Sequence, residues 1–179
     1  IPETIKSRCA YFYANRLSET NLIRFIDNNY SGLSEEEKAF LMNVSLGSPE
    51  VINEIMDKKI YDFYQSLLED LISSKSFLNF KDNNILLINS KEQESLKNLL
   101  NIVINDLIKK SLFFIIENKY PEFTLDKEKK FIQQIVQKNN HSNLIDLYST
   151  FNKNMNAAET LNLNKSDILI DSFKDLCGI

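Results

Sequence analysis

The chain has 179 residues, of which 43% are hydrophobic and 26% are charged, the composition of an ordinary globular protein. Its formal net charge of −4 would repel a phosphate backbone, so independent DNA binding is not expected. No apolar run approaches the roughly 18 residues that a membrane span needs. Glycine and proline occur only three times each, which disfavours hairpins and favours helices joined by short connections. We therefore expect an all-α fold.

The cysteine and glycine content limits the chemistry of the chain. Cys9 and Cys177 lie near opposite ends, with no second cysteine or histidine at metal-ligand spacing, so neither a zinc site nor a disulfide framework is expected. With no signal peptide in the sequence, the expected location is the reducing cytoplasm. The glycines are too scattered for a phosphate-binding loop, so we expect no bound nucleotide or other cofactor and no enzyme activity from this chain by itself.

The N-terminal region begins with a stretch that is typical of a strand. Residues 10–16 alternate loosely and include three aromatic side chains. No other part of the sequence alternates convincingly, and a single strand cannot satisfy its own backbone groups. The sheet to which this strand belongs is therefore expected to lie outside the sequence.

Three short helices are expected between residues 18 and 58, because each start has a capping signal. The second has the strongest signal, a capping box followed by an acidic first turn. The three signals are Ser18, Ser34 with Glu37, and Ser48 followed by Pro49.

Longer amphipathic helices are expected in the second half of the chain, where apolar residues recur at helical spacing. The change in helix length places a domain boundary near residues 58–60. One helix becomes apolar nearly all round at residues 111–116, which is typical of a domain centre or a subunit interface. The apolar positions of the last helix are Ile168, Leu169, Phe173 and Leu176.

Other candidate sites have simpler structural explanations. His141, the only histidine, precedes a serine at a predicted helix start, so we expect a surface or capping role. The acidic runs 35–37 and 92–94 resemble solvated first turns rather than a catalytic pair. A helix-turn-helix over residues 34–58 is disfavoured, because its second helix would present carboxylates to DNA phosphates.

The first twelve residues, IPETIKSRCAYF, contain the most specific motif in the chain. They resemble the clamp-loader branch of the AAA+ ATPases, and in particular the bacterial delta-prime subunits, in which a Pro-x-Thr-Ile-x-Ser-Arg-Cys segment leads into an aromatic-containing strand. The stretches LSETNL, LGSPEVINEI and NLNKSDILIDSFKDL are similar to the start of the family's lid domain, its Gly-Ser helix start and its last collar helix. Long helical stretches match by pattern only.

The resemblance implies a division of the chain into three parts. Residues 1–17 correspond to the end of the AAA+ nucleotide-fold domain, residues 18–59 to a three-helix lid domain, and residues 60–179 to a helical collar domain. The collar domains of five subunits form a ring in the family. The apolar stretch 111–116 and the last helix are therefore the expected contacts with other subunits, with burial in the core of this chain as the alternative.

The resemblance also assigns a role to Arg8. In the family, the arginine of the Ser-Arg-Cys motif is an arginine finger that reaches the γ-phosphate of ATP bound by a neighbouring subunit. A planar, permanently charged guanidinium suits the developing phosphoryl charge. Ser7 and Cys9 are expected to support its position and packing, whereas the alternative for Arg8 is a surface ion pair.

Two departures from the family pattern bear on ATP binding. Glu50 stands where ATP-binding relatives have a sensor arginine after the Gly-Ser pair, and a carboxylate there would repel a triphosphate. Lys6 stands where a second arginine is common. We therefore expect a subunit that does not bind ATP itself, with the ATP held by its neighbour.

The resemblance implies a role in DNA replication within a complex like the DNA polymerase III holoenzyme, whose clamp loader is an ATPase. The implied partners are the gamma/tau and delta subunits and, through the assembled complex, the sliding clamp and primer-template DNA, with no membrane partner. A gamma/tau-type subunit is one alternative. A helical scaffold that docks partner peptides, with Arg8 incidental, is the other.

Overall fold

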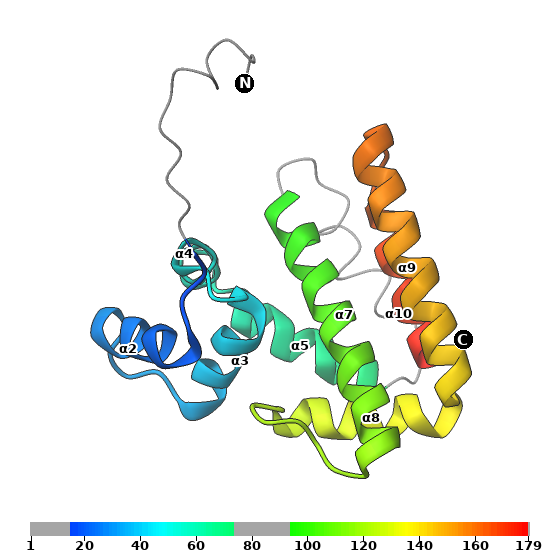
Figure 1. Ribbon diagram of the computed structural model, residues 1–179, viewed down its shortest axis with the longest axis horizontal. Helices are drawn as coiled ribbons and strands as arrows, with labels where there is room; N and C mark the ends of the chain where they lie inside the picture. Colours follow the sequence, from blue (N-terminus) through cyan, green and yellow to red (C-terminus); the bar gives the residue numbers. More distant parts are fainter. Residues whose placement is uncertain (1–14, 74–93, 179) are drawn as a thin grey trace.

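The structure, a computed structural model, describes residues 15–73 and 94–178, which form eight helices and no strand (Figure 1). The predicted all-α fold is confirmed for these residues. The predicted strand at residues 10–16 lies almost wholly outside them. The helices are α2 (Glu19–Asn29), α3 (Glu35–Ser45), α4 (Pro49–Asp57), α5 (Ile60–Ser73), α7 (Glu94–Glu117), α8 (Asp126–Lys138), α9 (His141–Leu161) and α10 (Ser166–Cys177).

The three short helices begin where the capping signals predicted. The hydroxyl of Ser18 accepts a hydrogen bond from the backbone N–H of Asn21, and that of Ser48 accepts one from Val51. At the start of α3 both halves of the capping box form, because Ser34 accepts from the N–H of Glu37 and donates its own N–H to the Glu37 carboxylate. Each bond satisfies a backbone donor that the first helical turn leaves open.

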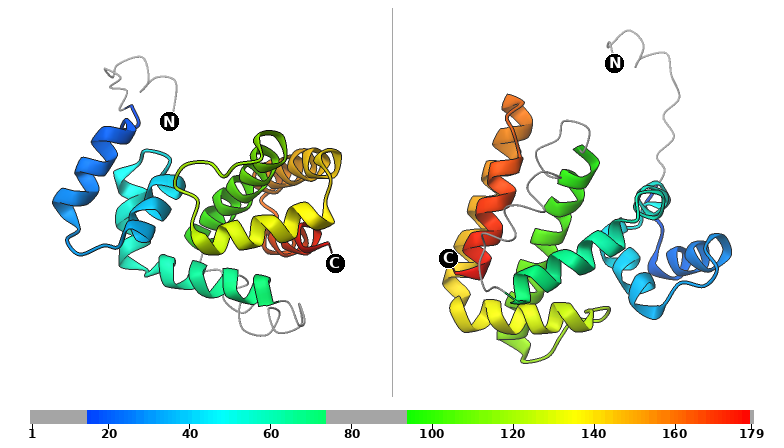
Figure 2. Two further views of the ribbon diagram at one scale, coloured as in Figure 1. Left: turned by 90° about the horizontal axis from the view of Figure 1, so that it is seen from below. Right: turned by 180° about the vertical axis from the view of Figure 1, so that it is seen from behind.

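The helices form two groups in space. Helices α2, α3 and α4 make a small three-helix unit, and α5 leads away from it (Figure 1). Helices α7, α9 and α10 pack on one another, and α8 crosses one end of this bundle, with α5 packed against α8 (Figure 2). The three-helix unit meets the bundle where α3 packs on α7. The assignment of these groups to a lid and a collar stays a prediction.

One buried apolar cluster extends through both groups. The Phe40 ring of α3 stacks on the Tyr64 ring of α5 at a centroid distance of 4.9 Å and lies 5.4 Å from the Tyr61 ring. Phe40 and Tyr64 are buried. The three-helix unit is therefore joined to the rest of the chain by packed aromatic rings, beyond the covalent connection near Lys59.

The two apolar stretches that were expected to contact other subunits differ in burial. Leu169, Phe173 and Leu176 of α10 are fully buried within the chain. In the stretch 111–116 of α7, Phe113 is 37% exposed and Ile116 is 65% exposed. Of these two stretches, the one on α7 therefore exposes apolar side chains, whereas the apolar face of α10 belongs to the core. Within the described ranges, no helix has both the length and the apolar character needed to cross a membrane.

Candidate functional site

The residues to which the sequence assigned the arginine finger, Arg8 with Ser7 and Cys9, lie outside the described residues, as does Lys6. Their roles therefore stay predictions. The structure does describe the chain from Asn15 onward, and thus the point at which this segment joins the three-helix unit. Glu50, which the resemblance aligns with a sensor arginine, lies in the first turn of α4 and is exposed.

Leu17, at the end of the N-terminal segment (residues 1–17), is bonded to the turn between α3 and α4. The backbone N–H of Leu17 donates to the carbonyl oxygen of Gly47 at 2.9 Å. Gly47 has a φ of +82°, and a Cβ there would lie 2.8 Å from the carbonyl oxygen of Leu17 and 3.0 Å from the Cβ of Arg16. Only glycine allows this approach, because it tolerates positive φ and has no side chain.

Replacing Gly47 by alanine is expected to lower the free energy of unfolding by about 2–3 kcal/mol. About 1–2 kcal/mol comes from the left-handed backbone, and about 1 kcal/mol comes from the hydrogen bond to Leu17, which the new methyl group would displace. Urea denaturation followed by circular dichroism measures the loss.

Gly32 provides the matched control for this change. Its φ is +84°, but a Cβ there meets nothing within 4 Å. Gly32→Ala should therefore cost only the backbone contribution of about 1–2 kcal/mol. Equal losses for the two variants would show that the contact of Gly47 with the N-terminal segment contributes nothing.

Two further expectations concern the surface. His141 is exposed and is the first residue of α9, whose N-cap is Asn140, so the predicted surface role is confirmed. Glu35 and Glu36 are exposed in the first turn of α3, as expected of a solvated acidic turn. Residues 92 and 93 of the second acidic run lie outside the described residues.

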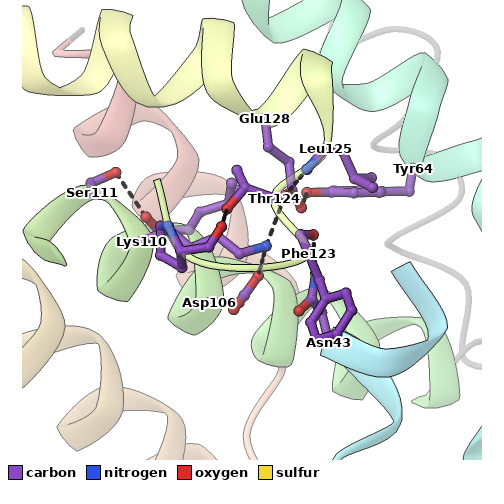
Figure 3. A network of polar contacts seen from close by, with 11 residues as sticks. Asn43, Tyr64, Asp106, Lys110, Ser111, Phe123, Thr124, Leu125 and Glu128 are labelled. Atoms are coloured by element: carbon purple, nitrogen blue, oxygen red, sulfur yellow. Dashed lines mark hydrogen bonds and ion pairs between the residues drawn. The ribbon is translucent and has the colours of Figure 1, made fainter. Parts of the chain in front are cut away.

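A buried polar network centres on Glu128, in the first turn of α8 (Figure 3). Its carboxylate accepts hydrogen bonds from the Tyr64 hydroxyl at 2.6 Å, the Lys110 ammonium at 2.7 Å and the Leu125 backbone N–H at 3.0 Å. The donors come from α5, α7 and the connection before α8. Glu128 therefore ties three separate segments together at one point.

Lys110 extends the network to a second carboxylate. Its ammonium lies 2.6 Å from the Asp106 carboxylate, one turn earlier on α7. The side chains of Lys110 and Glu128 are 4% and 2% exposed, so no substrate can reach them, whereas Asp106 is 26% exposed. We interpret the network as a structural connection rather than a catalytic acid–base pair.

The same region is bonded to the three-helix unit. The Asn43 side chain of α3 donates to the carbonyl oxygen of Phe123 at 2.9 Å (Figure 3). Phe123 lies in the α7–α8 connection, two residues before Leu125, and has a φ of +61°. The α7–α8 connection is therefore bonded to α3 through Phe123 and Asn43, and to Glu128 of α8 through the Leu125 N–H.

Burial changes the acidity of two groups in the network. Burial, and next the negative charge of Glu128, raise the pKa of Tyr64 well above its ordinary value. Burial raises the pKa of Asp106 above its ordinary value of 3.8, against the opposing effect of Lys110. Ionised Asp106 is therefore less favourable in the fold than in the unfolded chain, even with Lys110 beside it.

The raised pKa of Asp106 predicts a pH dependence of stability. A carboxyl group whose pKa is raised on folding stabilises the fold fully below its unfolded pKa, and this contribution is lost as the pH rises through the folded pKa. The stability of the wild type relative to Asp106→Asn should therefore be greatest below about pH 3.8 and should decrease as the pH rises. Urea titrations of both proteins across this range measure the difference, and a difference that is constant or increases with pH would contradict the prediction.

Sequence reasoning did not find this network. The spacing of Asp106 and Lys110 is that of an ordinary surface ion pair on a helix, and Glu128 resembles any acidic residue in a first turn. One signal was present, because Glu128 follows Leu125 at capping-box spacing. It does not identify Tyr64, which is 64 residues away in the chain from Glu128.

In the described part of the chain, no group of three or more histidine, cysteine, aspartate or glutamate side chains is placed to hold a metal ion. The candidate site has two parts. One is the hydrogen bond from Leu17 to Gly47, and the other is the buried network in which Glu128 of α8 is bonded to α5, α7 and the connection before α8. Comparisons with protein-family models, with curated proteins and with solved structures found no match.

Proposed function

We propose that the chain is part of a delta-prime-like clamp-loader subunit in bacterial DNA replication. In this proposal it assembles with gamma/tau and delta subunits and contributes Arg8, in trans, to the ATP site of a neighbour. It binds no ATP itself, and its complex loads the sliding clamp onto primer-template DNA. The proposal rests first on the motif Ser7-Arg8-Cys9 and on the order of helices in the sequence.

One structural observation carries most of the support. Two of the stretches on which the resemblance rests, LSETNL and LGSPEVINEI, meet in space through the hydrogen bond from Leu17 to Gly47, 30 residues apart in the chain. A finger that acts on another subunit must be presented from a fixed point, because misplacement by about 1 Å can cost about 10²-fold in rate. A tight backbone attachment nine residues after Arg8 is consistent with that requirement.

An exposed apolar strip offers a surface for subunit contact. Asn105 of α7 is bonded to Asn152 of α9, and Lys109 lies over the ring of Tyr148, so the two helices run antiparallel at this seam. One to two turns from this seam, toward the C-terminal end of α7 and the N-terminal end of α9, three apolar side chains are exposed. Phe113 and Ile116 of α7 are 37% and 65% exposed, and Ile145 of α9 is 44% exposed. Exposed apolar side chains in one region are typical of an interaction surface.

Size-exclusion chromatography of the chain with gamma/tau and delta subunits of the same organism tests the assembly. We expect the chain to co-elute with them. Ile116→Glu should weaken co-elution, because a carboxylate would be desolvated in the contact. Leu161→Glu is the matched control, since Leu161 is also 65% exposed but lies at the opposite end of α9.

Separate elution of the wild-type chain would contradict the proposal and favour the scaffold alternative. Equal loss of co-elution in Ile116→Glu and Leu161→Glu would remove the α7–α9 strip as the contact. ATP binding by the intact subunit, measured by equilibrium dialysis, would favour the gamma/tau-type alternative.

A further inference from the structure

A polar hollow lies where the three-helix unit meets the bundle, and it shares Asp106 with the buried network. Its volume is about 300 Å³, near the lower end of the range for ligand sites. Its walls come from α3, α7 and α9. Most of its lining residues are polar, and four of them are asparagines: Asn43, Asn101, Asn105 and Asn152.

The carboxamides of the hollow are held in place by bonds to one another. Asn152 donates to the side-chain oxygen of Asn105 at 2.9 Å, and Asn105 donates to the side-chain oxygen of Asn101 at 3.0 Å. Asn152 also donates to the carbonyl oxygen of Tyr148 at 2.8 Å. The chain of carboxamides runs across the α7–α9 seam, so a ligand there would meet polar groups that are already ordered.

Several polar atoms of the hollow have no hydrogen-bond partner within residues 15–73 and 94–178. They are the amide nitrogen of Asn101, a donor, and the side-chain oxygens of Asn43 and Asn152, which are acceptors. A ligand that fits this set must both accept and donate hydrogen bonds. A peptide main chain does so at every residue except proline.

The charges in the hollow favour an uncharged ligand. Lys109 and Asp106 both line it, and Lys109 lies 5.8 Å from the centre of the Tyr148 ring. Asp106 is paired with Lys110, which is also paired with Glu128, so these four groups carry two charges of each sign. Neither a cation nor an anion therefore gains a net attraction there. Leu46, which is 47% exposed, contributes an apolar wall.

Leu46 also lines a second hollow, of about 380 Å³. Its lining includes the apolar residues Leu17, Leu22, Met42 and Phe123, together with the charged residues Arg16 and Glu19. A bound peptide that crosses Leu46 could place its main chain among the carboxamides and one apolar side chain in the second hollow.

We propose that the polar hollow binds an extended, uncharged peptide segment of a partner protein through its main chain. The main-chain N–H groups of the peptide donate to Asn43 and Asn152, and a main-chain carbonyl accepts from Asn101. An apolar side chain of the peptide next to this point occupies the hollow beyond Leu46. The peptide thereby bridges α3 to α7 and α9, independently of Arg8.

The test is a selection from a library of capped hexapeptides without charged residues against the full chain, in competition with a library rich in charged residues. We expect uncharged peptides with one apolar residue to be enriched. Asn101→Asp should weaken binding of the enriched peptides at least tenfold, measured by fluorescence anisotropy, because it replaces the outward donor by an acceptor and keeps the bond from Asn105.

Asn154→Asp is the matched control and should bind like the wild type, since Asn154 is exposed on α9 and is not part of the hollow. Asn152→Ala supplies a second variant, with thermal unfolding to confirm that it folds. No enrichment, preferential enrichment of charged peptides, or equal affinity in Asn101→Asp and the wild type would overturn the proposal. Arg8→Ala should bind the enriched peptides like the wild type. The peptide result is therefore independent of whether Arg8 acts in a clamp loader.

Discussion

Replacing Arg8 by alanine in the intact subunit should reduce the DNA-stimulated ATP turnover of the assembled loader by about 10³-fold or more at the site that Arg8 serves. The guanidinium supplies positive charge and directed N–H donors where negative charge develops on the transferred phosphoryl group, and alanine supplies neither. Assembly should be unaffected, because the contact surface proposed above lies on α7 and α9. Steady-state phosphate release by the reconstituted complex measures the effect.

Two controls separate the finger from a general effect of charge. Arg8→Lys keeps the positive charge but loses the planar donor geometry, so its turnover should fall between those of the wild type and Arg8→Ala. Arg16→Ala removes an exposed arginine at the base of the same segment and should leave turnover unchanged. Unchanged turnover in Arg8→Ala, with normal assembly, would contradict the proposed function.

Replacing Lys110 by methionine should lower the free energy of unfolding by about 3–5 kcal/mol, the cost of removing one partner from a buried ion pair. Methionine has a similar length, so little packing is lost. The carboxylate of Glu128, which is 2% exposed, would lose its charged donor, and Asp106 would lose its ion-pair partner. Urea denaturation at neutral pH measures the loss.

Lys109→Met is the matched control, because Lys109 is the preceding residue of α7 and is exposed. Its loss should be within about 0.5 kcal/mol, as is usual for surface substitutions. The double variant Lys110→Met with Glu128→Gln should recover part of the stability, since glutamine removes the buried charge and can still accept from Tyr64. A loss in Lys110→Met no larger than that in Lys109→Met would show that the network contributes little to stability.

The positions of the short helices could be predicted because their signals are local. Ser18, Ser34 and Ser48 each bond to a backbone N–H three residues along the chain, so the interaction that starts the helix is present in a short stretch of sequence. The scarcity of glycine and proline and the helical spacing of apolar residues determined the all-α class for the same reason. The side of a helix that is buried was harder to predict, as the exposed Phe113 and Ile116 of α7 show.

The contacts between distant segments were decided by the tertiary structure. Tyr64, Lys110 and Glu128 come from three helices, and no local feature of any one of them identifies the other two. The bond from Leu17 to Gly47 and the carboxamides across the α7–α9 seam likewise depend on how the helices pack. The sequence by itself determined where the three short helices begin and that the fold is all-α, since those signals act over about one helical turn. Only the packing of the helices brought the buried charges and the asparagines together, because the groups that stabilise them lie tens of residues away along the chain.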